Sequence, residues 1–185
     1  MPTPIVLDLE ENERIIYEIK RHPIRLIPMF AVAIVAIISL LLLMFMILSN
    51  EVSLINVSDL PFGQFALYLS FAVMVALVFV FTLILASVDM ANELVVTNEN
   101  IVQVLQYTPF NRKVSHLNLA KIQDVSIRQK GVLPSLFNYG SISIETAGEA
   151  ANFYFRFAIN PTVAGKIIVE AQEQYVKTRH NNPAN

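Results

Sequence analysis

Four basic side chains in the C-terminal half are the best candidates for a binding site. Arg112, Lys113, Arg128 and Lys130 flank two successive β-like segments. If these segments form a hairpin, the four side chains meet at its open end, as a patch for anionic lipid headgroups or an acidic protein partner. An ordinary solvated strand end is the other interpretation, and it is favoured because sparse surface charge is normal.

The remaining chemically active side chains do not combine into an active site or a metal site. His22, His116 and His180 lack metal-ligand spacing, and the chain has no cysteine. Asp124 and Glu145 are isolated acids, and the sequence contains no nucleotide-binding loop, nucleophile elbow or zinc-peptidase motif. We therefore predict that the protein is not an enzyme and uses no metal or cofactor.

The composition points to a membrane. The chain has 185 residues, of which 55% are hydrophobic and only 15% are charged, and the charge deficit is concentrated in two segments. Charged residues make up about a quarter of an ordinary soluble domain. The formal net charge of −2 lacks the basic excess of a nucleic-acid-binding protein, so we expect no nucleic-acid partner.

Two long uncharged runs, 26–48 and 61–88, are predicted to be transmembrane helices joined by a short loop, 49–60. At about 1.5 Å per residue, either run can cross a hydrocarbon layer of ~30 Å. A cleaved signal peptide fits poorly, because the first run is long and follows an acidic leader. Because neither run carries a charged side chain, the pair resembles an anchor more than a solute pathway.

The distribution of lysine and arginine predicts the orientation of these helices. Lys20, Arg21 and Arg25 precede the first run, whereas the loop carries Glu51 and Asp59 and no basic residue. The positive-inside rule then places both termini in the cytoplasm and the loop outside. We thus expect a multi-pass membrane protein with the lipid bilayer as a partner.

A different pattern begins after the second run, and residues 92–176 are predicted to form a cytoplasmic α+β domain. The expected strands are 94–97, 101–107, 113–119, 122–129, 141–146 and 153–159. In the last strand, alternation predicts Phe153, Phe155, Phe157 and Ile159 inward, with Arg156 among the outward residues.

A helix is expected to follow these strands and to cover the sheet. Asn160 and Pro161 form a start signal. The apolar stripe consists of Val163, Ile167, Ala171 and Tyr175, with Ala164 and Ile168 beside them. Residues 177–185 are expected to be a frayed, flexible polar tail. The domain is therefore predicted to be a curved antiparallel sandwich or partly open barrel capped by a C-terminal helix.

Two segments allow two interpretations each. In the leader, 1–25, the alternation of Ile15, Tyr17 and Ile19 favours a strand that joins the domain, although a helix over 9–21 also fits. The apolar segment 132–137 contains Pro134, so it is not a central strand. It either binds a partner or a membrane from an exposed position, or tucks under the barrel.

At this point the chain resembles the membrane-anchored bacterial pleckstrin-homology-like (PH-like) proteins, in which a transmembrane hairpin precedes a PH-like domain. The matching pieces are ERII (13–16), KRHP (20–23), LVVTN (94–98), LAKIQDV (119–125) and LFNYG (136–140), followed by SISI (141–144). The resemblance implies a PH-like fold and a place in the cell (inner) membrane, and it implies no catalytic residues.

The chain departs from the pattern of this family at one position. Asn100 stands where the family often has arginine, which removes a candidate anion contact. The loop 98–100 is short and acidic, so the phosphoinositide site of eukaryotic PH domains is not transferred to this chain.

These observations lead to three functional hypotheses. The first is a scaffold or adaptor that holds a protein partner, or a second copy of itself, at the membrane; small residues at Ala31, Ala33 and Ala36 and open sheet edges favour it. The second is a module that binds or senses anionic lipid. The third is an accessory subunit of a transporter or protease complex, recognised through its helical hairpin.

Overall fold

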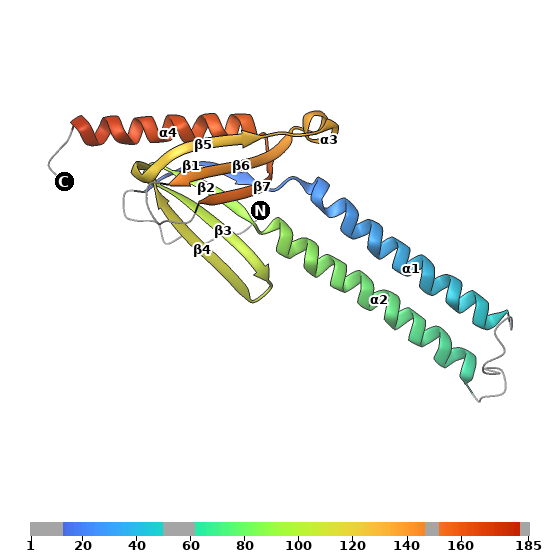
Figure 1. Ribbon diagram of the computed structural model, residues 1–185. Helices are drawn as coiled ribbons and strands as arrows, with labels where there is room; N and C mark the ends of the chain where they lie inside the picture. The colour runs from blue at the N-terminus through green and yellow to red at the C-terminus, as the bar shows by residue number, and fades with distance from the viewer. Residues whose placement is uncertain (1–12, 50–61, 147–151, 182–185) are drawn as a thin grey trace. The chain divides into compact units, whose positions relative to one another are not determined.

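A computed structural model describes residues 13–49, 62–146 and 152–181 of the chain (Figure 1). The predicted loop 49–60 and the predicted turn 147–149 lie almost entirely outside these residues. The chain divides into two compact units, one formed by residues 1–22 and 88–185 and the other by residues 23–87. The leader therefore belongs to the same unit as the C-terminal part.

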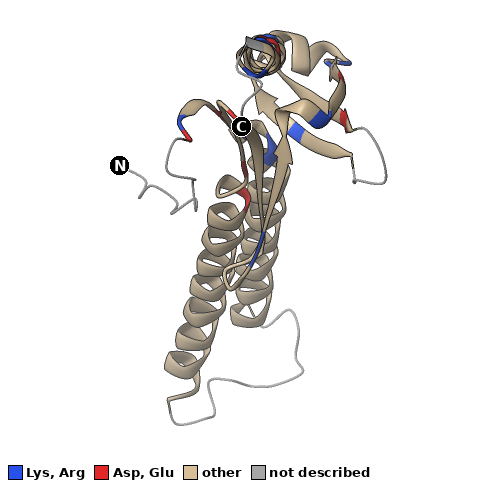
Figure 2. Ribbon diagram, turned by 90° about the vertical axis from the view of Figure 1, so that its left-hand side faces the viewer, with Lys and Arg blue, Asp and Glu red and all other residues tan. Residues whose placement is uncertain are grey.

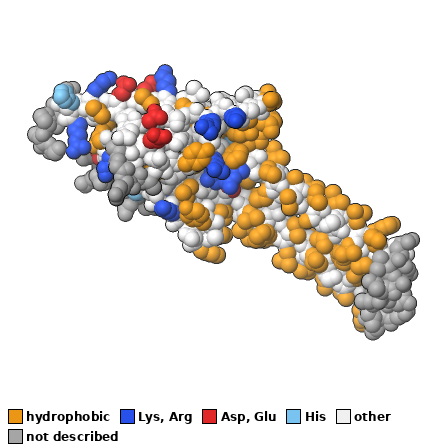
Figure 3. All heavy atoms as spheres, viewed as in Figure 1, with side chains coloured by type: hydrophobic (Ala, Val, Ile, Leu, Met, Phe, Trp, Pro, Cys, Tyr) orange, Lys and Arg blue, Asp and Glu red, His pale blue; other side chains and the backbone are white. Residues whose placement is uncertain are grey.

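The helical unit contains a short 3₁₀ turn, η1 (Pro23–Arg25), the helix α1 (Leu26–Leu48) and most of α2 (Gly63–Met90). Both helices are long and apolar enough to span a bilayer by length and composition. No charged residue occurs in either helix before Asp89, as Figure 2 shows, and most large apolar side chains are exposed (Figure 3). The unit therefore offers a nearly uncharged apolar surface.

The serine and threonine hydroxyls of these helices bond within the helix that carries them. The hydroxyls of Ser39, Ser70 and Thr82 donate to carbonyl oxygens three or four residues earlier, at 2.8, 2.8 and 2.7 Å. This local bonding is common where a helix has no water to satisfy a hydroxyl. These side chains therefore present no organised polar path.

The second unit contains two antiparallel sheets and two helices. The first sheet has the order β1–β2–β3–β4, and the second has the order β5–β6–β7. The strands are β1 (Ile15–Lys20), β2 (Glu93–Thr97), β3 (Asn100–Thr108), β4 (Asn111–Asn118), β5 (Ile122–Arg128), β6 (Tyr139–Thr146) and β7 (Phe153–Ile159). The helices are α3 (Val132–Leu136) and α4 (Pro161–Asn181), and a 3₁₀ turn, η3 (Leu119–Lys121), connects the two sheets.

The leader forms a strand and not a helix. β1 pairs antiparallel with β2, from Ile15 opposite Thr97 to Lys20 opposite Glu93. Beyond β1, Arg21 forms an isolated bridge with Ala158, and the His22 amide donates to the Phe157 carbonyl at 2.6 Å. The leader thereby links the edge of the first sheet to β7 of the second.

The larger of the two hydrophobic clusters found among the described residues lies between the sheets and α4, and the smaller consists of Val95, Val102 and Val104. The fully buried members of the larger cluster come from both sheets and from the helix: Ile19, Leu94, Val96, Ile101, Leu119, Ile142, Ile144, Phe155, Ala158, Ala164 and Ile168. Ile19 shows that the leader contributes to this core and does not merely lie beside it. The predicted antiparallel domain with a helical cap is thus observed.

Two details of α4 differ from the predictions. Ala164, Ile168 and Ala171 of the predicted stripe are buried, but Val163, also expected in that stripe, is 51% exposed. The prediction of a frayed tail is wrong for residues 177–181, because α4 continues to Asn181. Exposed pairs of opposite charge four residues apart, such as Glu173 with Lys177, stabilise a polar helical turn without burial.

The prediction for the second half of β7 is also wrong. Ala158 is fully buried and Phe157 only partly, the reverse of the expected alternation. Gly140 pairs with Ala158 and Ile142 with Phe155, so two residues of β7 oppose one residue of β6. This β-bulge, at which Phe157 has φ of 58°, reverses the inward and outward faces of the strand beyond it.

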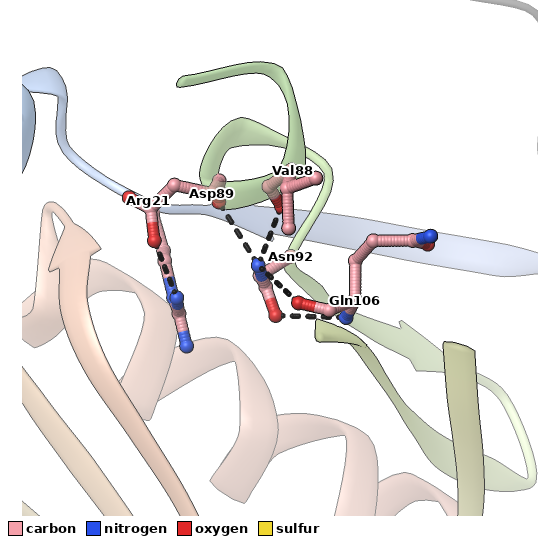
Figure 4. Close-up of polar contacts among 5 residues, drawn as sticks. All are labelled: Arg21, Val88, Asp89, Asn92 and Gln106. Carbon is pink, nitrogen blue, oxygen red and sulfur yellow. Dashed lines mark hydrogen bonds and ion pairs between the residues drawn. The ribbon is translucent and has the colours of Figure 1, made fainter. Parts of the chain in front are cut away.

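A cluster of polar contacts joins residues from both ends of the inserted helical segment (Figure 4). Arg21 donates to the Asp89 carboxylate at 2.9 Å, and both side chains are about 15% exposed. The Arg21 guanidinium also lies 5.6 Å from the centre of the Phe155 ring. Asn92 donates to the Val88 carbonyl at 2.9 Å and accepts from the Gln106 amide at 3.0 Å. The Arg21–Asp89 pair holds the start of the C-terminal part against the end of the leader, and Asn92 connects the end of α2 to β3.

Asp89→Asn is expected to lower the free energy of unfolding of the domain by about 3 kcal/mol, because it removes the charge opposite a mostly buried guanidinium. Chemical denaturation of the full chain in a neutral detergent, followed by near-UV circular dichroism, measures this loss. The control Glu170→Gln breaks an exposed pair with Lys166 and should cost about 0.3 kcal/mol. Equal losses in the two variants would contradict the importance of the Arg21–Asp89 pair.

Candidate anion-binding site

The four predicted site residues do not lie at one hairpin end. β4 pairs with β3 and β5 pairs with β6, so the predicted hairpin of these two segments is wrong. Between them, the Asn118 side chain accepts from the Ala120 amide at 3.0 Å and starts η3, while Leu119 and Ile122 turn into the core. Because these apolar side chains are buried in the core, the chain leaves the first sheet after β4 and enters the second sheet at β5.

Two of the four residues, Arg128 and Lys130, line a cavity of about 240 Å³ on the second sheet, together with Arg156. The other lining residues are Pro134, Tyr139, Gly140, Ser141, Tyr154 and Phe157. None of the lining residues that the structure describes is acidic. We call this cavity the basic pocket.

The strand order of the second sheet assembles the basic pocket. Arg128 on β5 pairs with Ser141 on β6, and Arg156 and Phe157 on β7 lie opposite Ser141 at the bulge. A bulge re-aims the side chains around it, and such features are frequent beside binding sites. The serine hydroxyl is therefore flanked by a cation from each neighbouring strand.

Sequence reasoning missed Arg156 as a site residue. Alternation placed it outward, but only the β5–β6–β7 order brings it near Arg128. One sequence feature could have identified Arg156, namely the predicted turn between the last two strands. A hairpin at that turn places residue 156 near residue 141.

The positive charge of the pocket affects a neighbouring phenol. A hydrogen bond with Ser141 lowers the pKa of Tyr154 below its usual value, and the positive charges of Arg156 and Arg128 lower it further. The Arg156 guanidinium lies 5.1 Å from the centre of the Tyr154 ring. Groups that favour a phenolate also favour a bound anion.

Close packing shapes the wall of the pocket. A Cβ atom on Gly140 would lie 2.8 Å from the Arg128 carbonyl oxygen and 3.0 Å from Pro161 Cγ, so only glycine lets these segments approach. The Asn138 amide donates to the Asn160 side chain at 2.6 Å, and the Gln129 amide donates to Asn138 at 3.2 Å. These bonds fix the loop that borders the pocket.

The basic pocket can hold a phosphate-like anion. Arginine provides several donors in a planar fork that matches phosphate oxygens, and Lys130 adds an ammonium group with three donors. Among the residues that the structure describes, no group of three or more His, Asp or Glu could hold a metal ion. Within residues 13–49, 62–146 and 152–181, no carboxylate or imidazole lines the pocket beside Ser141, so these groups suit binding more than acid–base chemistry.

A second cavity, of about 440 Å³, lies at the other end of the domain and suits an anion less well. It is lined by the turn between β2 and β3, the C-terminal half of α4 and Ile16 of β1. Glu99 and Arg179 supply charges of opposite sign, and Arg179 donates to the Tyr175 hydroxyl at 3.2 Å. The basic pocket is therefore the stronger candidate.

Arg112 and Lys113 lie on β4, opposite Gln106 and Leu105 of β3, and do not line the basic pocket. The positive charge of Arg112 lowers the pKa of Glu93 on β2, but other effects on this carboxyl are larger. Burial raises the pKa of Glu93, the nearby Glu18 raises it further, and Lys20 and Arg112 partly offset the rise. Arg112 therefore belongs to a surface of mixed charge.

A family model described as "Bacterial PH domain" matches residues 22–171, most of the chain. The match covers α1, α2 and the sheets from β2 onward. No curated protein and no solved structure matches the chain. The family match confirms the resemblance inferred from the sequence.

Glu93→Gln is expected to raise the melting temperature of the domain at pH 7. A raised pKa means that folding favours the protonated carboxyl, so this group stabilises the fold below its ordinary pKa of 4.5 and loses that contribution as pH rises. The difference in melting temperature between Glu93→Gln and the natural chain should therefore vanish near pH 4. Thermal unfolding of the full chain in neutral detergent across this range measures the effect.

Arg112→Gln is the control, because its effect on the melting temperature should have the opposite sign. It removes a cation that favours the Glu93 carboxylate, so it should lower the melting temperature at pH 7. A gain from Glu93→Gln that persists unchanged at pH 4 would contradict the role of burial.

Proposed function

Because this chain belongs to the bacterial PH domain family, we propose that it is a non-enzymatic, membrane-anchored PH-like protein that binds anionic lipid headgroups at the cytoplasmic surface of the cell membrane. The observation that carries the proposal is the basic pocket. Arg128, Lys130 and Arg156 face one cavity with Ser141, and no acidic side chain of the described part of the chain lines it. Anionic leaflets attract such clusters by about 1 kcal/mol per cation near the surface.

The properties of α1 and α2 support a membrane anchor. A core helix of a soluble protein is mostly buried, but the most apolar windows of these helices are only 6% and 11% buried. Side chains such as Val32 and Phe45 are exposed by 71% and 67%. Such large apolar surfaces are stable in hydrocarbon and not in water.

Cysteine labelling tests the proposed orientation, because the natural chain contains no cysteine. In right-side-out membrane vesicles, Ser58→Cys in the loop between the helices should react with a membrane-impermeant maleimide. Thr178→Cys on α4 should react only after permeabilisation. The reverse pattern would contradict cytoplasmic termini, and loss of the protein into the supernatant on alkaline carbonate extraction would contradict the anchor.

The basic pocket is tested with the full chain in neutral detergent and a water-soluble dihexanoyl phosphatidylglycerol. The triple variant Arg128→Gln/Lys130→Gln/Arg156→Gln should lose about 3 kcal/mol of binding free energy, roughly a hundredfold in Kd by calorimetry. The matched control Arg112→Gln/Lys113→Gln, outside the pocket, should bind within about threefold of the natural chain. Equal effects of the two sets, or no effect of the triple change, would contradict the proposal.

A scaffold that holds a protein partner or a second copy is the second candidate, and the free edge of the first sheet supports it. Among the described strands, β4 pairs only with β3. By contrast, α4 covers β5, where the Gln172 side chain donates to the Ile122 carbonyl at 2.8 Å. An open edge can accept a strand from another chain. A monomeric mass by light scattering, together with no stoichiometric partner in a mild-detergent pull-down, would contradict this candidate.

A further inference from the structure

The segment that contains α3 exposes a set of large apolar side chains, which we call the α3 patch. Its members are Val132, Leu133, Leu136 and Phe137, which are 81%, 54%, 71% and 48% exposed. The alternative that this segment tucks under the barrel is therefore wrong. Contiguous exposed apolar side chains usually mark an interaction surface.

The α3 patch is ordered before any partner arrives. The Phe137 amide donates to the Leu133 carbonyl at 2.9 Å, and the Ser135 hydroxyl donates to the Gly131 carbonyl at 3.0 Å. Asn138, at the end of the segment, is held by Gln129 and Asn160. Local hydrogen bonds reduce the cost of moving a backbone turn into an apolar medium, and pre-ordering reduces the entropy lost on binding.

The α3 patch is continuous with the basic pocket. Pro134, in the middle of α3, lines the pocket together with Arg128 and Lys130, which precede α3 in the chain. Figure 3 shows hydrophobic side chains gathered at the position of α3 in Figure 1, with lysine and arginine side chains beside them. One surface therefore presents the apolar side chains of the α3 patch next to the basic side chains of the basic pocket.

We propose that the α3 patch inserts into the boundary between headgroups and acyl chains, while the basic pocket holds the phosphate of an anionic lipid in the same leaflet. The ligand is then a lipid that remains in the bilayer and not a free phosphate compound. This inference rests on the proposed function and adds the way in which the site meets its ligand.

A bilayer is the occupant that matches both parts of this surface. Apolar side chains partition into the acyl boundary, and adjacent cations attract anionic headgroups; peripheral membrane-binding helices use the same combination. An acidic peptide would satisfy the cations and leave Val132 and Leu136 in water. The apolar surfaces of α1 and α2, proposed above as a membrane anchor, belong to the same chain.

The insertion is tested with an environment-sensitive fluorophore on Leu136→Cys in the otherwise cysteine-free full chain, reconstituted in nanodiscs. In discs of equal parts phosphatidylcholine and phosphatidylglycerol, shallow nitroxide-labelled lipids should quench this probe several-fold more than a probe on Val169→Cys. Val169 is 39% exposed on α4 and lies outside both the patch and the pocket. Discs of phosphatidylcholine alone should reduce quenching at position 136 to the level of position 169.

The outcomes separate the inference from the proposed function. No quenching at position 136, with lipid binding by the pocket intact in detergent, overturns the insertion and leaves the pocket standing. Quenching at position 136 could instead persist in neutral discs and also in the triple variant Arg128→Gln/Lys130→Gln/Arg156→Gln. This result overturns the headgroup function and supports insertion by apolar side chains alone. A probe that is shielded from nitroxide lipids and cross-links to another protein overturns the bilayer as the occupant.

Discussion

The pairing of β1 with β2 is the constraint on which the rest of the domain depends. The two strands are separated in sequence by the whole helical hairpin, yet Lys20 of the leader pairs with Glu93 directly after α2. The ordered domain therefore requires both ends of the inserted hairpin to meet. Apolar burial provides much of the free energy, since Ile19 and Leu94 are fully inaccessible to solvent. The Arg21–Asp89 pair then adds a charged contact at the same place.

The bulge in β7 links the core to the candidate site. By adding one residue against β6, it turns Ala158 into the core and leaves Arg156 and Phe157 opposite Ser141. Ala158 in turn forms the bridge with Arg21 that connects the second sheet to the leader. One local irregularity thus contributes to the closure of the domain and to the assembly of the basic pocket.

Three groups of charged side chains in the domain lie in distinct electrostatic environments. Arg21 and Asp89 form a mostly buried pair, whose role is structural. Arg112 and Lys20 lie near Glu93 and Glu18, where opposite signs compensate. Arg128, Lys130 and Arg156 line a cavity to which the described residues contribute no acid, so their positive charge acts on solvent or on a ligand. The contrast between these environments, more than the number of basic residues, distinguishes the candidate site.

Local patterns in the sequence determined most of the elements. The two apolar runs, the six C-terminal strands and the helix after Asn160 could all be predicted, because periodicity and turn residues act over a few neighbouring positions. The strand in the leader was also favoured, by the alternation of Ile15, Tyr17 and Ile19. The family resemblance then placed these elements in a PH-like order.

Only the tertiary structure decided which segments meet. Arg112 and Arg128 were expected at one hairpin end, but the burial of Leu119 and Ile122 sends β4 and β5 to different sheets. Arg156 joins the site because three strands align at Ser141, and Asp89 finds Arg21 across an insertion of more than sixty residues. Such contacts follow from the packing of distant segments against one core, and local sequence patterns carry no record of that packing.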